Sequence, residues 1–158
     1  MRRILPALFC LFLLAAPALA GDLSGLFPDA VGDMPRVQLA TGQDAQAEVD
    51  RLHGKALEAE ASGVARYARG DERPAEVWVS RVSSEAEARR QTGLMVHKMF
   101  ENPQSPFQNP GRINHGDTAV YRFTGMGQVH LIWYSGDLVW WVSASPADET
   151  AFLEAFCL

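Results

Sequence analysis

Residue types that commonly do chemistry are sparse in this chain of 158 residues, which has four histidines and two cysteines. Motifs typical of catalysis or metal binding, such as G-x-S-x-G, H-E-x-x-H and C-x-x-C, are absent from the sequence. His115 and His130 could meet near Asp117 if residues 101–117 fold back over the strands that follow. This pair is the basis of one alternative hypothesis, a small metal-binding protein or hydrolase.

Two further candidates for chemistry are better explained by packing. Met95, His97 and Met99 carry soft and imidazole ligands that suit copper, but on a helix His97 lies about 200° around the axis from Met95. Cys157, near the end of an apolar helix, lacks the electropositive surroundings that would make it a thiolate. We expect this thiol to be buried, with an intermolecular disulfide as the alternative. The sequence therefore predicts no catalytic residue, no metal site and no cofactor.

The first twenty residues have the pattern of a signal peptide. Arg2 and Arg3 precede an apolar run over residues 4–16, and Ala18–Ala20 form an A-x-A cleavage site. The run is shorter than the ~20 residues that a helix needs to cross a bilayer. We therefore predict cleavage before Gly21, no membrane insertion afterwards, and a periplasmic or secreted protein.

Composition places residues 21–158 in one globular domain. Hydrophobic residues make up 47% of the chain and charged residues 21%, which excludes a disordered or a disulfide-rich protein. Loss of two arginines leaves 12 basic against 19 acidic side chains, so the formal charge changes from −5 to −7. A surface of that sign repels phosphate backbones, and we expect no nucleic-acid partner.

Hydrophobic periodicity and turn residues predict an α+β fold. Strands are expected at 36–40, 63–69, 76–82, 118–123, 128–135 and 138–144, and helices from about 41 to 53, from 83 or 84 to about 100, and from 145 onwards. Residues 23–35 read as a lead-in segment that docks through a few apolar side chains. Residues 101–117, rich in Pro, Asn and Gly, are expected to form a long loop.

These elements predict a two-layer sandwich, with a mostly antiparallel sheet and helices packed on one face. Trp78-Val79-Ser80 and Trp141-Val142-Ser143 each precede a helix, which suggests two strand-strand-helix halves. Chance similarity between two ordinary strand-to-helix junctions is the alternative.

The last two strands should form a hairpin across Gly136-Asp137, and both of its faces are apolar. Trp133 and Trp140 fall on a core face. The opposite face carries His130, Ile132, Tyr134, Val139, Trp141 and Ser143. A second apolar face has three explanations: coverage by the chain itself, an interface, or a groove for a ligand.

We therefore predict an exported, non-catalytic binding or accessory module of the cell envelope. It would contact a protein partner, a second copy in a homodimer, or a small apolar ligand through the hairpin face and the 101–117 loop. The residues expected to bind are Tyr134, Trp141, Ile132, His130 and Phe107. A ligand-free structural domain of the envelope is the remaining alternative.

Overall fold

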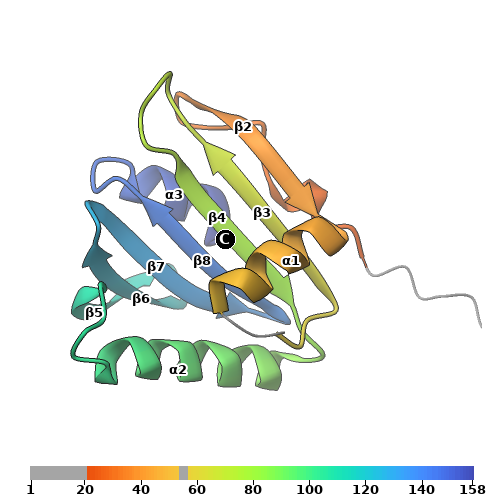
Figure 1. The fold of residues 1–158 in the computed structure, drawn as a ribbon, viewed down its shortest axis with the longest axis vertical. Helices are drawn as coiled ribbons and strands as arrows, with labels where there is room; N and C mark the ends of the chain where they lie inside the picture. Colours follow the sequence, from red (N-terminus) through yellow and green to blue (C-terminus); the bar gives the residue numbers. More distant parts are fainter. Residues whose placement is uncertain (1–20, 54–56) are drawn as a thin grey trace, which may run out of the picture.

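The computed structural model describes residues 21–53 and 57–158. Its strands form one antiparallel sheet in the order β1-β2-β3-β4-β8-β7-β6-β5 (Figure 1). The strands are β1 (Ala30–Val31), β2 (Met34–Thr41), β3 (Ala61–Tyr67), β4 (Ala75–Arg81), β5 (Gln108–His115), β6 (Thr118–Gly125), β7 (Gln128–Ser135) and β8 (Leu138–Ala144). The helices are η1 (Ser24–Leu26, a 3-10 turn), α1 (Gly42–His53), α2 (Glu85–Glu101) and α3 (Glu149–Phe156).

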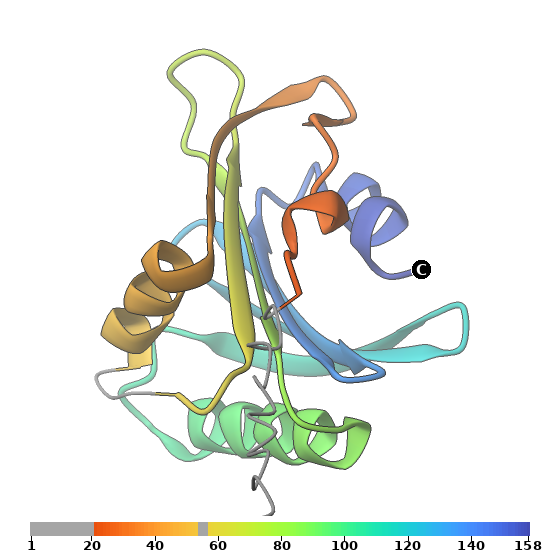
Figure 2. The same ribbon diagram turned by 90° about the vertical axis from the view of Figure 1, so that its right-hand side faces the viewer.

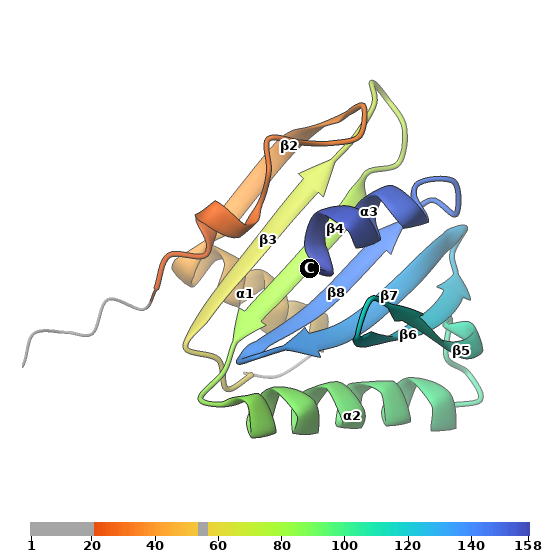
Figure 3. The same cartoon turned by 180° about the vertical axis from the view of Figure 1, so that it is seen from behind.

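The predicted α+β class and the antiparallel sheet are confirmed, and the helices cover both faces of that sheet. α1 and α2 lie on one face, whereas α3 and η1 lie on the other (Figures 2 and 3). The difference from a one-sided arrangement follows from the central strands, which are apolar on both sides and therefore need cover on both. We call the two sides the α1/α2 face and the α3 face.

The sheet divides into two runs of four strands that meet where β4 pairs with β8. Trp78 on β4 lies directly opposite Trp141 on β8, so the two similar tripeptides are neighbours across this seam. The helices that follow β4 and β8, α2 and α3, lie on opposite faces. The similarity of the two halves therefore holds for the strands and does not extend to the helices.

The α3 face holds the main core. Trp133 and Trp140 face each other across the β7–β8 hairpin, as predicted, and their rings stack 5.7 Å apart and 6° from parallel. Phe156 of α3 packs on Trp140, with ring centroids 5.8 Å apart. The lead-in segment docks on the same core through buried Leu23 and Phe27, which confirms its predicted role.

α2 begins where its sequence indicates. The hydroxyl of Ser84 accepts a hydrogen bond from the backbone N–H of Glu87 at 3.2 Å, which satisfies one of the free donors of the first turn. The inner edge of the helix is buried at Ala88, Thr92 and Met99, and partly buried at Met95 and Val96. No described helix is both long and apolar enough to span a membrane.

The prediction of a long loop at 101–117 is wrong. Residues 108–115 form the edge strand β5, and the connection from α2 is confined to 102–107. Two of the residues that indicated a loop, Asn109 and Pro110, lie at a register shift between Gln108 and Gly111, where Asn109 has a φ of 50°. An edge strand tolerates Pro110 at such a bulge because no second neighbour requires its missing N–H. Sequence composition alone cannot distinguish this edge strand from a loop.

Candidate binding groove

A groove of about 530 Å³ lies on the α1/α2 face between the two helices. Its floor is formed by β4 and β8 through Trp78, Val139 and Trp141. Its walls are apolar side chains of α1, of α2 and of the segments that follow these helices: Val49, Leu52 and Leu57 on one side, and Leu94, Met95, Met99 and Phe107 on the other. Pockets that hold small molecules have volumes of roughly 300–1,000 Å³ and mostly apolar linings.

The indoles of the floor belong to a row of directly paired residues that crosses the sheet. From β3 to β6 the row runs through Val64, Trp78, Trp141, Ile132 and Tyr121. Each of these side chains points to the α1/α2 face, because directly opposite residues in an antiparallel sheet share a side. Ile132 is fully buried, whereas Trp78 and Trp141 remain partly exposed and form the floor.

The α1 wall comes from the last turns of that helix. Val49, Leu52 and His53 are spaced by three and four residues and so share one side of the helix. Val49 is buried against the sheet, but Leu52 is 50% exposed. The Nδ1 atom of His53 lies 2.8 Å from the carbonyl oxygen of Val49, to which it donates, so the imidazole is fixed against the helix end.

The α2 wall is made of two rows with helical spacing. Gln91, Met95 and Met99 form the inner row, and Arg90, Leu94 and Lys98 form the outer row at the rim. Leu94 is 43% exposed, although it lies beside the buried edge of the helix. Leu52 and Leu94 thus present apolar surface to solvent from opposite walls of the groove.

One end of the groove is closed by polar contacts. The amide nitrogen of Gln91 donates to the backbone carbonyl of Glu58 at 3.1 Å and to the carboxylate of Glu87 at 2.8 Å. Arg90 makes two hydrogen bonds to the same carboxylate, at 2.6 and 2.7 Å. The hydrogen bonds and charge of Glu87, with a smaller contribution from Glu58, raise the pKa of Arg90. The Arg90 cation at this end is therefore already paired.

Beside the floor, a chain of hydrogen bonds fixes the Trp141 indole. Its Nε1–H donates to the hydroxyl of Ser143 at 3.1 Å, and that hydroxyl lies 2.9 Å from Nδ1 of His130. Nε2 of His130 lies 3.1 Å from the carbonyl oxygen of Gly125, which can only accept. The imidazole is therefore the neutral Nε2–H tautomer, which accepts from Ser143. Burial, the largest cause, lowers the pKa of His130, and nearby Arg73 lowers it further.

Phe107 covers this network. Its ring stands edge-on to the imidazole of His130, with centroids 4.8 Å apart, and to the indole of Trp141 at 5.4 Å. The short connection after α2 brings Phe107 here, because the backbone around Pro106 passes tightly over Gly125. The predicted proximity of Phe107 to the hairpin face is thus found, although a strand follows Phe107 in place of the expected loop.

The five residues expected to bind lie on one face but differ in access. Trp141 and Phe107 line the groove, and Tyr134 lies partly exposed beside Val139 on the same face. Ile132 and His130 are 0% and 2% exposed, because Phe107 and Trp141 pack against both of them and α2 also covers Ile132. A ligand in the groove would meet Trp141 and Phe107 directly. Ile132 and His130 would act only by supporting them.

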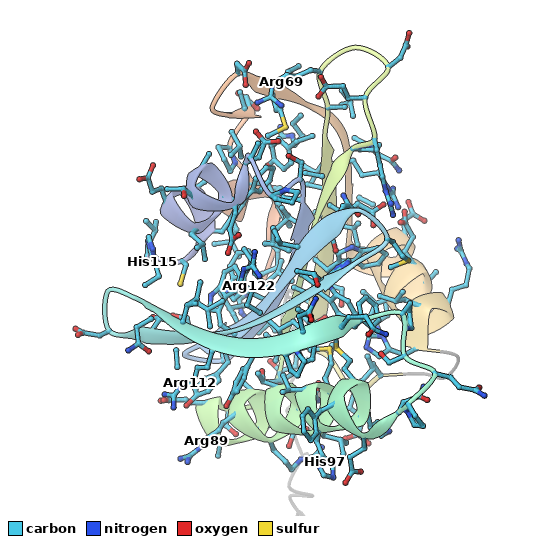
Figure 4. The ribbon with its side chains drawn as sticks, turned by 90° about the vertical axis from the view of Figure 1, so that its left-hand side faces the viewer. Arg69, Arg89, His97, Arg112, His115 and Arg122 are labelled. Atoms are coloured by element: carbon cyan, nitrogen blue, oxygen red, sulfur yellow. The ribbon has the colours of Figure 1, made fainter. Side chains whose placement is uncertain are left out.

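The two histidines of the alternative hypothesis do not meet. His115 pairs with Thr118 at one end of β6, and His130 pairs with Phe123 near the other end. Five residues of strand separate these positions by about 17 Å, and an odd spacing places them on opposite faces. Figure 4 shows His115 on the side of α3. Within residues 21–53 and 57–158, no three His, Cys, Asp or Glu side chains are grouped as metal ligands.

Cys157 also lies away from the groove. Its thiol is unpaired with any other cysteine of the described chain and is buried in the core of the α3 face, as expected. Burial raises the pKa of this thiol. A raised pKa and lack of access make it a poor nucleophile.

Several lining residues were missed from the sequence. Val49, Leu52 and Met95 lie in predicted helices at spacings that an ordinary core edge explains, and Trp78 lies in a predicted strand, so none of them stands out as a binding residue. Leu94 could have been noticed in the sequence, because it is an apolar residue outside the row of helix positions that the core needs. α1 packs on β2 and β3, whereas α2 packs on β7 and β8, and the sequence does not show that these two positions leave a gap between the helices. The groove could therefore not be predicted.

The described residues thus provide an apolar groove with fixed aromatic groups at its floor and a paired polar end. A concave, mostly apolar lining of this kind suits the binding of a small molecule. Comparison of the chain with protein-family models, with curated proteins and with solved structures found no match.

Proposed function

We propose that this protein is a non-catalytic binding module that takes up a small apolar molecule in the groove between α1 and α2. The observation that carries the proposal is the pair Leu52 and Leu94, which stay about half exposed on opposite walls above an aromatic floor. Burial of apolar surface stabilises by about 25 cal/mol per Å². A ligand that covers both leucines and the two indoles would therefore gain hydrophobic free energy without displacing any part of the fold.

A concave groove favours a small molecule over a flat protein partner. The lining is recessed between two helices, and its polar side chains are confined to one end and the rim. Protein interfaces of standard size bury roughly 800 Å² on each partner, which requires a broader surface than this groove. A second copy of the chain or an apolar segment of another protein remains an outcome that the experiment separates.

We further propose that the module acts after export, in the periplasm or outside the cell. The support is the cationic start, the short apolar run and the small-residue triplet within residues 1–20, a leader assignment that lies outside the described residues. Mass spectrometry of the chain recovered from the periplasmic or culture fraction should give an N-terminus at Gly21. A chain that keeps residue 1 and remains with the cytoplasm would refute this part of the proposal.

The groove is tested with a neutral apolar probe, N-phenyl-1-naphthylamine, whose fluorescence rises in apolar surroundings. We expect one site per chain. Leu94→Gln and Leu52→Gln should each weaken binding by about threefold to tenfold, since each removes up to roughly 1.4 kcal/mol of apolar contact. Both side chains are half exposed, so the melting temperature should change little.

The matched control is Phe100→Gln on the same helix. Phe100 is 68% exposed and does not line the groove, so this substitution removes a larger apolar side chain without touching the site. It should leave probe binding unchanged. Equal loss in Leu94→Gln and Phe100→Gln would indicate nonspecific surface adsorption. Absence of binding to the wild-type chain would favour the ligand-free structural domain, and light scattering that shows a dimer would favour a second copy.

A further inference from the structure

We infer that the ligand of this groove is a single-chain amphiphile with an anionic head, a long-chain carboxylate, whose head group pairs with Lys98. This inference rests on the proposed function and specifies its ligand class. It comes from the distribution of charge along a groove whose floor and walls are otherwise apolar.

Two cations of α2 stand on the rim, and only one is paired. Arg90 is held by Glu87 at the closed end. Lys98 lies two helical turns further along the same row, about 12 Å away at 1.5 Å per residue. Its ammonium group forms no ion pair with the described acidic side chains, although its neighbour His97 pairs with Glu101 at 3.0 Å. The unpaired cation and the paired one therefore mark opposite ends of the groove.

Between these ends the lining is apolar. Leu94 and Met95 follow the rim from Arg90 to Lys98, and Trp78 and Trp141 lie below. A tail placed along the floor meets side chains without charge until it reaches either end. At the closed end the Arg90 charge is already compensated by Glu87, and Glu58 adds a negative charge, whereas Lys98 attracts an anionic head. The charges thus favour one orientation, with the tail over the indoles and the head at Lys98.

The charge of the whole chain makes this local arrangement selective. The protein carries a formal charge of −5, so its overall field does not favour the approach of an anion. An anion that enters this groove nevertheless meets an uncompensated ammonium group at its rim. An amphiphile with a cationic head would gain nothing from Lys98 and would be repelled by it.

The experiment compares two probes with the same tail, 11-bromoundecanoate and 11-bromoundecan-1-ol, below their micelle concentrations. The terminal bromine quenches tryptophan fluorescence at short range, so quenching reports a tail that lies over Trp78 and Trp141. Trp133 and Trp140 are 1% and 4% exposed and pack in the core of the α3 face, so a tail in the groove should quench them less than the two floor indoles, although Trp140 borders the groove. Both probes should quench, and the carboxylate should bind about threefold to fivefold more tightly, as an exposed ion pair allows.

Lys98→Gln should remove the preference for the carboxylate and leave binding of the alcohol unchanged, while Lys98→Glu should reverse the preference. The control is Arg89→Gln, which removes a charge from the same helix at a side chain that projects away from the groove (Figure 4). It should keep the preference. A general charge effect would lower carboxylate binding equally in the Lys98 and Arg89 variants.

The outcomes separate the two proposals. If both probes bind with equal affinity, or if the preference survives in Lys98→Gln, the inference on the anionic head is wrong and the apolar groove stands. If neither probe quenches, both proposals are wrong. If the carboxylate binds only when anionic lipid vesicles are present, the chain recognises a membrane surface and the inference is again refuted.

Discussion

The hydrogen-bond chain beside the groove predicts a large effect from a small substitution, Ser143→Ala. The Ser143 hydroxyl accepts from the Trp141 indole and donates to Nδ1 of His130, at 3.1 and 2.9 Å. Ser143 is 7% exposed and His130 is 2% exposed, so water cannot easily replace the hydroxyl at the imidazole. The substitution removes a single oxygen atom and leaves almost no cavity.

The expected cost follows from the groups left without partners. A buried acceptor or donor that loses its partner costs about 1–3 kcal/mol. His130 Nδ1 should contribute most of this cost, and the Trp141 N–H less, because that indole borders the groove. We expect Ser143→Ala to lower the free energy of unfolding by about 2 kcal/mol. With m-values of 1–3 kcal/mol per M for small proteins, the urea midpoint should fall by about 1 M.

Thr92→Val is the matched comparison. The Thr92 hydroxyl is buried against the same face but has no hydrogen-bond partner, so its removal should be neutral or stabilising by up to about 1 kcal/mol. Urea unfolding followed by circular dichroism measures both variants. Midpoints for Ser143→Ala and Thr92→Val that agree within error, or a Ser143→Ala cost below about 0.5 kcal/mol, would refute the assigned tautomer and network.

Three other predictions follow from single contacts. Burial holds the pKa of His130 below its ordinary value of 6.5, so just below pH 6.5 the unfolded chain binds a proton at this residue that the folded chain does not. The free energy of unfolding should therefore fall as the pH drops from 6.5 toward 5. This fall should persist in His115→Gln but diminish in His130→Gln. Cys157 should react with a thiol reagent at a rate limited by opening of the native fold, and rapid labelling of the native chain would contradict its burial. Gly125→Ala would place a methyl group against the Pro106 carbonyl and should cost at least about 1–3 kcal/mol in urea unfolding; a neutral result would mean that Phe107 does not pack as described.

Most of the fold could be predicted because its signals are local. The N-cap at Ser84, the two-residue turn at Gly136-Asp137 and the alternation around Trp133 and Trp140 each depend on residues close together in sequence. Two elements were not predicted correctly, because their own residues do not indicate the structure they adopt. The segment 108–115 has the composition of a loop, and only its pairing with β6 makes it a strand. α3 begins at Glu149, four residues after the expected cap, because a turn intervenes at 146–148.

The candidate site was predictable in part. The doubly apolar hairpin correctly placed Trp141 and Tyr134 on a common face, because alternation along a strand fixes sides. It could not show which of these side chains another element would cover. Ile132 and His130 carry the same pattern as Trp141, yet α2 and Phe107 bury them. Lys98 gave no signal, since any exposed helix position can carry lysine.

The order of the residues determined the element types other than β5, the two apolar sides of β7 and β8, and the burial of Cys157, because these depend on short-range backbone preferences and on hydrophobic spacing. The tertiary structure alone determined that α1 packs on β2 and β3 while α2 packs on β7 and β8, which leaves a groove between them over β4 and β8. The placement of the two helices depends on how segments far apart in the chain, such as those that carry Leu52 and Leu94, pack against one sheet. The space between these helices, and the charge of Lys98 at its rim, exist only once that packing is complete.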